Sequence, residues 1–476
     1  MSRTLDEYDF SDFNHELECT EITHFHRVRR EPNTTYHDMF ALSELTDMYP
    51  MLYSQFIQGW SRSYYTGADH LKAILQYQHP NTPFTQVDQE AYTQAYDNVR
   101  QRLSSLPTVR AFDVLTELDS VPYEPSSAAG YDYIGAKGPR EGHNFNRAIR
   151  RAKAVLWSAI APDGEGMDHV LRTAVPDVGY TRTQLTELKD KTKVRGVWGR
   201  AFHYILLEGT SAAPLLDAFK SSNTFFHIGH DPTATVPAVL SDTARQCPWL
   251  LSLDWKQFDA TVSRFEIKSA FALLKEHMTF PNYETEQCFE ICKHLFIHKK
   301  IAAPDSHIYW SHKGIPSGSY FTSIIGSVIN RLRIEYIWII LFNRGPKVCY
   351  TQGDDSLIGD DEYVRPEIIA EIALPLNWLV NTDKTAVSRC PEYITFLGRT
   401  SYGGLNQRDL KRCLRLLVLP EFPVHSGRIS AYRAHSIAQD AGNTSRVLND
   451  IARRLRRKYG LATQDEIPRY FQLFYP

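Results

Sequence analysis

The segment Val348-Cys-Tyr-Thr-Gln-Gly-Asp-Asp-Ser-Leu-Ile-Gly359 sets two adjacent aspartates between two apolar stretches. Residues 348–351 and 356–359 favour strands, and Gly353 permits a tight turn between them. The pattern predicts a β-hairpin with Asp354 and Asp355 at its tip. Adjacent carboxylates repel each other unless cations neutralise them, and Mg²⁺ favours a few carboxylates together with phosphate oxygens. A solvated turn without a bound ion is the alternative interpretation.

A second acidic position follows the apolar segment Trp249–Leu253, which predicts a buried strand. Asp254 ends this strand, where an unpaired carboxylate is costly unless it binds a metal or a hydrogen-bond donor. Two-metal phosphoryl transfer uses carboxylates from separate strands, so we expect those of Asp254 and Asp354 about 3–6 Å apart. In the alternative interpretation, Asp254 caps a helix predicted over residues 261–277.

The loop Gly314–Gly318 precedes a long helix predicted over residues 319–341, which carries Asn330. Ser317 and Thr322 stand at the start of this helix. Free N–H groups at such a position can bind phosphate or sugar groups. Ordinary capping of the helix explains the same hydroxyl residues equally well.

Basic residues alternate along the segment before Trp198. Lys191, Lys193 and Arg195 would share one face of a strand because side chains alternate between the two faces. Three cations on one face suit a triphosphate. They also suit a solvated edge strand, where charges prevent unwanted strand pairing.

The composition is typical of a soluble globular protein. The chain has 476 residues, 43 % hydrophobic and 23 % charged, which suggests two or three subdomains. Its 53 basic and 55 acidic residues give a formal net charge of −2, unlike a protein that coats nucleic acid nonspecifically. Nucleic-acid binding therefore requires positive charge to be concentrated locally, as it is at 147–153, 189–200, 408–415 and 453–458.

Cysteine usage and hydropathy exclude other classes. The seven cysteines are scattered, which argues against a secreted disulfide framework. Cys288, Cys292, His294 and His298 resemble zinc ligands in spacing, but on one helix the two pairs would face apart. The N-terminus lacks the apolar stretch of a signal peptide, and the longest apolar run, Tyr336–Phe342, is too short to span a bilayer. We expect an intracellular protein without membrane partners.

Taken in this order, the segments resemble the viral RNA-dependent RNA polymerase family. The resemblance is closest to the partitivirus group of double-stranded RNA viruses, with the picobirnaviruses nearby. The matching residues are Asp254 and Asp259 (D-x4-D, motif A), Ser317, Gly318 and Thr322 (S-G-x3-T, motif B), Gly353–Asp355 (motif C), Asn381–Ala386 (motif D), Phe396–Arg399 (motif E), Lys193–Arg195 (motif F) and Pro125–Tyr133 (motif G).

The resemblance implies an α+β fold shaped like a right hand. An RRM-like antiparallel sheet would form the palm, and the fingers and thumb would be mostly helical. The expected subdomains are 1–245 (N-terminal region and fingers), 246–275 (palm, motif A), 276–313 (fingers insertion), 314–403 (palm, motifs B–E) and 404–476 (thumb). We also expect helices at 143–160 and 363–376, strands at 379–380 and 392–401, and helices on one face of the palm sheet.

The implied activity is that of an RNA-directed RNA polymerase that replicates and transcribes a viral double-stranded RNA genome. Asp254, Asp354 and Asp355 would hold two Mg²⁺ ions, for which Mn²⁺ can substitute, and Lys384 would protonate the departing pyrophosphate. The implied nucleotide-binding residues are Lys191, Lys193, Arg195, Asp259, Ser317, Thr322 and Asn330. The implied RNA-binding residues are Ser126, Ser127, Gly130, Tyr131, Gly318, Phe396 and Arg399.

The implied partners are an RNA template, the product duplex, nucleoside triphosphates and a viral capsid protein, in the virion interior and the host cytoplasm. One residue departs from the family's pattern. Many relatives carry Asn or Asp four residues after the motif B threonine, where this chain has Gly326. We therefore expect Ser317, Thr322 or Asn330 to hold the ribose-sensing Asp259 at about 2.6–3.2 Å.

Two alternatives stay open. A reverse transcriptase usually has an aromatic and an apolar residue before its paired aspartates, where this chain has Gln352-Gly353, and a large residue in place of Asp259. A noncatalytic RNA-binding protein with a palm-like fold has no need of all three acidic positions and Lys384.

Overall fold

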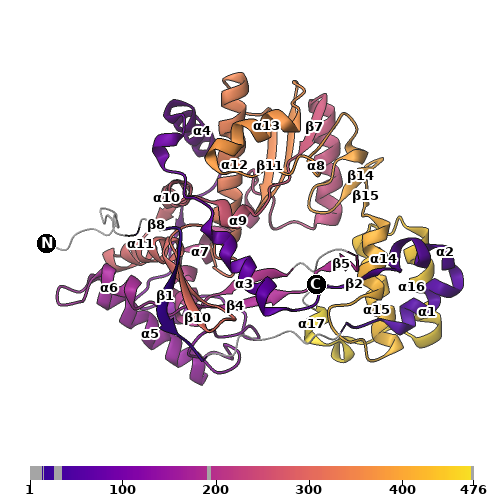
Figure 1. Cartoon of the computed structure of the whole chain (residues 1–476), viewed down its shortest axis with the longest axis horizontal. Helices are drawn as coiled ribbons and strands as arrows, with labels where there is room; N and C mark the ends of the chain where they lie inside the picture. The colour runs from indigo at the N-terminus through magenta and orange to yellow at the C-terminus, as the bar shows by residue number, and fades with distance from the viewer. Residues whose placement is uncertain (1–12, 14, 26–34, 190–193, 473–476) are drawn as a thin grey trace.

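A four-stranded antiparallel sheet lies at the centre of the palm (Figure 1). The computed structural model describes residues 13, 15–25, 35–189 and 194–472. The strands follow the order β11 (Val348–Gln352), β12 (Asp355–Asp360), β7 (Trp249–Ser252) and β13 (Ala386–Ser388), and every neighbouring pair is antiparallel. The expected α+β fold with an antiparallel palm sheet is confirmed.

Helices cover both faces of this sheet. Leu251 and Ile358 pack in the large core beside α10 (Arg264–Lys275), α12 (Thr322–Phe342) and α13 (Pro366–Ala373). Leu250 and Leu357 point to the other face and pack against α8 (Pro232–Gln246). The expectation of helices on one face alone is wrong, because successive residues of these apolar strands alternate between two buried faces.

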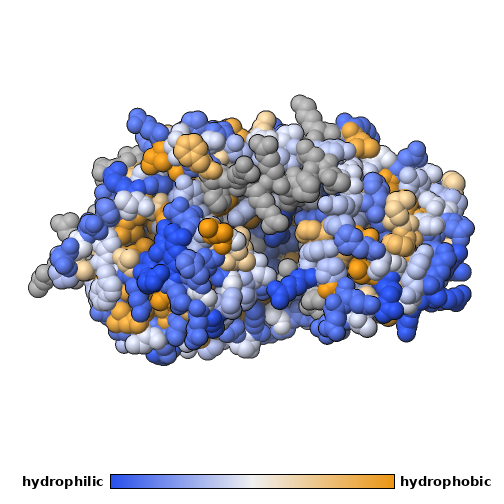
Figure 2. Space-filling model, turned by 90° about the horizontal axis from the view of Figure 1, so that it is seen from below, coloured by the Kyte–Doolittle hydropathy of each residue, from blue (hydrophilic) through white to orange (hydrophobic). Residues whose placement is uncertain are grey.

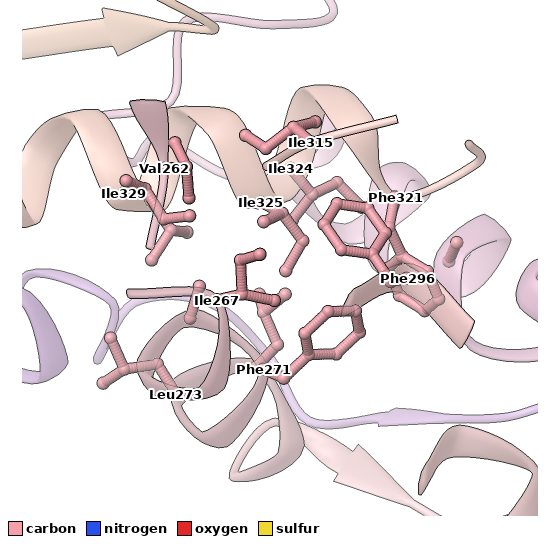
Figure 3. Close-up of a cluster of buried hydrophobic side chains, with 14 of the residues drawn as sticks. Val262, Ile267, Phe271, Leu273, Phe296, Ile315, Phe321, Ile324, Ile325 and Ile329 are labelled. Carbon is pink, nitrogen blue, oxygen red and sulfur yellow. The ribbon is translucent and has the colours of Figure 1, made fainter. Parts of the chain in front are cut away.

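The core under the palm joins helices from distant parts of the chain (Figure 3). Ile267 and Phe271 of α10 meet Ile325 and Ile329 of α12, and Phe296 of α11 (Tyr283–Ile297) closes the cluster. Each of these side chains is fully buried, a contribution of about 1.5–3 kcal/mol apiece. The helix α10 starts later than predicted because Ser263 and Glu266 form a capping box at its N-terminus.

The fingers contain a five-stranded sheet flanked by helices. Its strands follow the order β1 (Leu17–Thr23), β10 (His307–Ser311), β9 (Lys299–Ala302), β4 (Asp177–Arg182) and β6 (Arg195–Gly199). The helices of this region are α3 (Gly67–Leu75), α4 (Gln89–Arg102), α5 (His143–Ile160), α6 (Met167–Arg172), α7 (Phe202–Ser221) and α11. The basic helix predicted at 143–160 has the same bounds as α5. A short parallel pair, β3 (Val109–Arg110) with β8 (Met278–Thr279), lies between fingers and palm.

The thumb is built from both ends of the chain. Its helices α14 (Leu410–Val418), α15 (Gly427–Asp440) and α16 (Arg446–Tyr459) share one core with α1 (Met39–Met48) and α2 (Pro50–Leu52) (Figure 1). Residues Ala41, Leu45 and Ile57 are buried in this core. The assignment of the whole range 1–245 to an N-terminal region and fingers is therefore corrected, because the apolar face of α1 packs on thumb helices. The chain returns to the fingers through β2 (Trp60–Arg62), which pairs with β5 (Leu185–Glu187).

Two predicted strands are shorter than expected. Residues 379–380 form only an isolated bridge between Val380 and Trp255. The range 392–401 is interrupted by a tight turn, because Leu397 and Gly398 adopt positive φ values of +51° and +71°. A hairpin of β14 (Thr400–Tyr402) and β15 (Leu405–Gln407) follows, and the last helix described is α17 (Arg469–Gln472).

The surface seen from below is largely hydrophilic, with hydrophobic residues in small separate groups (Figure 2). Among the helices of the described residues, none combines the length and the apolar character needed to cross a membrane. The long helix α12 illustrates the point, because it carries Arg331, Arg333 and Glu335 within its span.

Candidate active site

The hairpin β11–β12 presents two aspartates at its tip. Gln352 pairs with Asp355 across the hairpin, which leaves Gly353 and Asp354 as the two turn residues. Gly353 has a φ of +59°, and a glycine at the first of two turn positions suits the twist of a β-hairpin. The turn therefore presents the side chains of Asp354 and Asp355 to solvent.

Helix α12 holds this turn from behind. Ser327 Oγ accepts a hydrogen bond from Gly353 N at 2.8 Å. Asn330 Nδ2 donates to the carbonyls of Gly353 (3.0 Å) and Asp355 (3.1 Å), and Asn330 Oδ1 accepts from Trp255 Nε1 at 2.8 Å. Because Asn330 is fully buried and its amide is engaged on both sides, its predicted role in nucleotide binding is corrected to one of fixing the turn.

Asp254 lies beside this turn. The register of β12 and β7 pairs Ile358 with Leu251 and Asp360 with Trp249, so continuing it along the strands brings Asp254 opposite Asp355. The backbone of Asp254 is fixed on both sides: its N–H donates to Thr385 Oγ1 at 3.1 Å, and its carbonyl accepts from Asn381 N at 2.8 Å. The separation of about 3–6 Å between the carboxylates of Asp254 and Asp354 stays a prediction.

The carboxylates interact electrostatically. Burial raises the pKa of Asp355 to about 6, and the negative charges of Asp354 and Asp254 add to the rise. Burial also raises the pKa of Asp354, where Asp254 adds to the rise and Arg195 opposes it. Both residues still reach solvent, so the surrounding protein displaces water without sealing the site. The site therefore has an excess of negative charge.

This donor set fits divalent cations. No basic side chain lies within 4.0 Å of the carboxylates of Asp254, Asp354 or Asp355 in the described part of the chain. Those described residues also hold no group of three or more His, Cys, Asp or Glu side chains already arranged around a metal position. Magnesium is commonly bound by one or two carboxylates together with water and substrate phosphates, so it needs no closed protein cage.

Asp259 lies at the start of the short helix α9 (Phe258–Thr261). Burial raises its pKa to about 7, the charge of Asp354 adds to the rise, and Arg195 and Lys299 oppose it. The expected hydrogen bonds from motif B are not formed. Instead, Ser317 Oγ accepts from Trp198 N at 2.9 Å and Thr322 Oγ1 donates to Pro316 O at 2.6 Å. The loop before motif B contacts Asp259 through the backbone, where Ile315 N donates to Asp259 O at 2.9 Å.

Arg195 faces the aspartates from the fingers. It begins β6, is exposed, and lowers the pKa of both Asp259 and Asp354 by its positive charge. The predicted ligands Lys191 and Lys193 lie outside the described residues. A cation facing the carboxylate cluster from the fingers is well placed to bind an incoming anionic substrate.

Lys384 is exposed on the turn that anchors Asp254. Asn381 and Thr385, at the two ends of this turn, both bond to the Asp254 backbone. Lys384 therefore belongs to the turn that is bonded to the Asp254 backbone, and its role as a proton donor stays a prediction.

The predicted RNA-binding residues divide into two groups. Ser126, Ser127, Gly130 and Tyr131 lie on one loop of the fingers, and Gly318 packs against β6, where an added Cβ would lie 2.0 Å from the Trp198 carbonyl oxygen. Phe396 and Arg399 are corrected, because Phe396 is buried in the core beside α8 and Arg399 forms an ion pair with Asp440. Phe396 therefore stabilises the palm core and Arg399 links the palm to α15 of the thumb, so neither side chain is presented to RNA.

Two buried lysines were missed by sequence reasoning. Lys299 Nζ donates to the carbonyls of Lys313 and Gly314 at 2.6 Å each, and its charge opposes the rise in the pKa of Asp259. Lys313 Nζ donates to the carbonyl of Ala260. Lys313 could have been predicted from its position directly before Gly314, whereas the local sequence around Lys299 gives no indication of a role.

The zinc-like residues form no metal site. Cys288 and Cys292 are buried on α11, and Cys288 Sγ donates to Leu207 O at 3.6 Å. They and the nearby His294 and His298 belong to no candidate metal cluster in the described residues. The core roles favoured from their spacing are consistent with this packing.

The palm sheet carries paired aspartates on a hairpin and a third aspartate on the neighbouring strand, between fingers and thumb. This arrangement defines the class of template-directed polymerases whose fold is shaped like a right hand. A family profile described as viral RNA-dependent RNA polymerase matches residues 36–456. The chain belongs to this family, which confirms the resemblance seen in its motifs.

Individual relatives align with smaller parts of the chain than the family profile does. The RNA-directed RNA polymerase of Cryptosporidium parvum virus 1 is 34 % identical over 112 residues, or 23 % of this chain and 21 % of that protein. That of White clover cryptic virus 1 is 23 % identical over 282 residues, or 50 % and 44 %. The genome polyprotein of human hepatitis A virus genotype IIIB is 30 % identical over 202 residues, or 38 % and 9 %. The chain thus spans less than half the length of these relatives.

Solved structures support the fold. The RNA-dependent RNA polymerase of a human picobirnavirus has a TM-score of 0.65 at 16 % identity, covering 89 % of this chain and 86 % of that one. Its insertion-loop deletion mutant gives a TM-score of 0.64 at 14 % identity, with coverage of 89 % and 87 %.

Proposed function

We propose that this chain is an RNA-directed RNA polymerase that replicates and transcribes the genome of a double-stranded RNA virus. The observation that carries the proposal is the cluster of Asp254, Asp354 and Asp355, which has no ion-pair partner among the described residues and has raised pKa values at two of its members. Neighbouring carboxylates repel one another unless cations neutralise them, so an uncompensated cluster in a polymerase fold favours bound cations.

In this proposal, Asp254, Asp354 and Asp355 hold two Mg²⁺ ions, which when bound stabilise the attacking and leaving oxygens. The 3′-hydroxyl of the growing strand loses its proton to solvent, and its oxygen forms a bond to the α-phosphorus as the bond from that phosphorus to the leaving pyrophosphate breaks. Lys384 gives a proton to the departing pyrophosphate. Arg195 binds the triphosphate, and Asp259 accepts a hydrogen bond from the ribose 2′-hydroxyl.

The substrates are then nucleoside triphosphates and an RNA template, and the product is an RNA duplex. A polymerase of a double-stranded RNA virus works with its genome inside a particle, so we propose the capsid protein as a further partner. The proposed locations are the virion interior and the host cytoplasm.

The test is nucleotide incorporation by the purified chain on a defined single-stranded RNA template with Mg²⁺. We expect labelled ribonucleotides to enter a product complementary to the template, and a chelator to abolish the signal. Preference for deoxynucleotides would establish the reverse-transcriptase alternative. RNA binding without incorporation of either nucleotide would establish the noncatalytic alternative.

A further inference from the structure

The buried lysine Lys299 begins β9 in the fingers sheet, and only 2 % of the residue is exposed. Its Nζ donates to the carbonyl oxygens of Ile297 at 3.2 Å, Lys313 at 2.6 Å and Gly314 at 2.6 Å. Among the described residues, no carboxylate lies within 4.0 Å of this ammonium group. A neutral amine has only two N–H groups, so three carbonyl acceptors favour the charged form.

The loop 313–315, directly before motif B, contains two of these carbonyls. The same loop donates hydrogen bonds to three carbonyls of the segment that carries Asp259. These bonds are Ile315 N to Asp259 O (2.9 Å), Gly314 N to Val262 O (2.9 Å) and Lys313 Nζ to Ala260 O. One loop therefore joins Lys299 to the backbone around Asp259.

The segment around Asp259 depends on contacts of this kind. Its helix α9 is only four residues long, which is too short to be stable through its own hydrogen bonds. The residue before the helix, Gln257, has a left-handed conformation with a φ of +50°, which residues other than glycine seldom adopt. The position of Asp259 is therefore maintained by groups outside its own segment.

Gly314 allows the loop to approach Asp259 closely. Its φ is +78°, and an added Cβ would lie 2.9 Å from Asp259 O and 2.6 Å from the ring of Tyr77. The hydroxyl of Tyr77 in turn donates to Ile315 O at 2.6 Å. Lys299 and Tyr77 therefore fix the loop, and the loop fixes the backbone of Asp259.

Lys299 and Asp259 also interact through their charges. Burial raises the pKa of Asp259 to about 7, and the positive charge of Lys299 opposes this rise. Burial lowers the pKa of Lys299, and the charges of Arg200 and Lys313 add to the fall. The negative charges of Asp177 and Asp259 oppose it. Each of the two groups therefore favours the charged form of the other, and the ionised carboxylate accepts hydrogen bonds on both oxygens.

We propose that Lys299 is a positioning residue for sugar selection: by holding the loop 313–315, it keeps the Asp259 carboxylate where the ribose 2′-hydroxyl binds. The inference rests on the proposed polymerase function and deepens it, because it names a residue on which the choice between ribose and deoxyribose depends. Lys299 is enclosed by protein and acts through the loop without touching the nucleotide. The hydroxyls of Ser317 and Thr322 bond elsewhere, so the backbone contacts of the loop provide the support that was expected from them.

The experiment measures kcat/KM for ATP and for dATP with the full chain, a defined RNA template and Mg²⁺. The variant Lys299→Met keeps the length of the side chain and removes its hydrogen bonds and its charge. We expect kcat/KM for ATP to fall about fivefold relative to that for dATP, because dATP offers no hydroxyl to Asp259 in either protein. The ratio of the two values does not depend on the fraction of folded enzyme, so a general loss of stability leaves it unchanged.

The matched control is Lys300→Met. Lys300 is the next residue of β9 and is also buried, with its Nζ over the ring of Trp310 and donating to Arg172 O. Because side chains alternate along a strand, Lys300 points away from the loop 313–315. We expect Lys300→Met to lower the melting temperature as Lys299→Met does, and to leave the ratio of ATP to dATP unchanged.

A gentler variant applies if Lys299→Met does not fold. Tyr77→Phe removes only the hydroxyl that donates to Ile315 O, and we expect it to lower the same ratio about twofold. Its control, Tyr92→Phe, removes a hydroxyl that donates to Ser269 Oγ at 2.9 Å, in another part of the protein, and is expected to leave the ratio unchanged.

A Lys299→Met protein with the ratio of the unmodified chain would overturn the inference, as would equal falls in Lys299→Met and Lys300→Met. An unchanged ratio in Tyr77→Phe would separate the loop from sugar selection and overturn it as well. If the unmodified chain incorporates ATP and the ratio is the same in every variant, the inference fails and the polymerase proposal stands. If the unmodified chain incorporates neither nucleotide, the polymerase proposal fails and the inference fails with it.

Discussion

Asp38 in the thumb and Asp354 in the palm show two opposite ways in which a protein uses the same side chain. Asp38 is fully buried and pairs with Arg433 at 2.5 Å, accepts from Ser430 Oγ at 2.8 Å, and caps α1 through Ala41 N at 3.0 Å. Asp354 has no ion-pair partner among the described residues and lies beside two further carboxylates.

The comparison distinguishes carboxylates that stabilise this fold from carboxylates that serve to bind a ligand. Around Asp38 every oxygen is satisfied, so the group stabilises the attachment of the N-terminal segment to the thumb. Around Asp354 the pKa is raised, first by burial and also by repulsion from Asp254, which costs stability and indicates a site for a cationic ligand. Substitutions at the two positions are therefore expected to have opposite consequences.

The largest effect is expected for Asp354→Ala. Incorporation is expected to fall by more than about 10³-fold, beyond the loss that one electrostatic contact causes, while the melting temperature stays the same or rises because repulsion is relieved. Steady-state incorporation and thermal unfolding give the two readouts. The control Asp361→Ala removes an exposed aspartate paired with Lys347 at the end of the same strand and is expected to change neither. Activity near that of the unmodified chain would end the polymerase proposal.

Asp38→Ala is expected to show the reverse. Leaving Arg433 buried without its partner costs about 3–5 kcal/mol, so denaturant unfolding should begin at a much lower concentration. Activity per folded molecule is expected to survive at low temperature. On the same helix, Asp47→Ala removes an exposed partner of Arg454 and is expected to cost less than about 1 kcal/mol. Equal losses in the two variants would remove the distinction between buried and exposed ion pairs.

Asp259 is intermediate between Asp38 and Asp354, and the selection of ribose over deoxyribose tests its role. If Asp259 accepts the ribose hydroxyl, Asp259→Ala should reduce the preference for ATP over dATP by about 10–100-fold, since a polar contact made only by the correct substrate is lost. Asn330→Ala should lower kcat without changing the preference, because Asn330 holds the turn. Selectivity that survives the loss of Asp259 would assign ribose recognition to another residue.

A smaller effect is expected for Arg195→Ala. The loss of one charged phosphate contact should raise the KM for nucleotides about tenfold with little change in kcat. Arg100→Ala is a suitable control, because Arg100 forms an exposed ion pair with Glu276. An unchanged KM would favour the solvated-strand interpretation of this basic segment.

The smallest effect concerns pH and stability without metal. Raised carboxyl pKa values of about 6 at Asp355 and about 7 at Asp259 stabilise the fold fully below about pH 4, and this contribution is lost as the pH rises through those values. We therefore expect the melting temperature to fall slightly from pH 5 to 8 in a chelator, and Mg²⁺ to reverse the fall. A profile that rises over this range would contradict the electrostatic account.

Local patterns predicted the palm well and the contacts between distant segments poorly. The predicted strands 348–351 and 356–359 became β11 and β12 with small changes at their ends, because turn chemistry and apolar alternation are encoded nearby. The burial of Phe396, the pairing of Arg399 with Asp440 and the packing of α1 in the thumb depend on partners far along the chain. The hydrogen bonds of Asn330 could not be predicted either, because the sequence of a buried helix does not show whether a polar side chain binds a ligand or a backbone carbonyl.

The division of the thumb between the two ends of the chain has a consequence for its synthesis. Helix α2 ends at Leu52 and α14 begins at Leu410, so 410 − 52 = 358 residue positions separate the N-terminal thumb helices from the C-terminal ones. At about 5–20 residues per second, α1 waits roughly 20–70 s on the ribosome before its partners emerge. During that interval its apolar face has no native cover, so a chain released early carries an exposed site for chaperones and proteases. Only a chain that includes the C-terminal helices can therefore complete the thumb and cover α1.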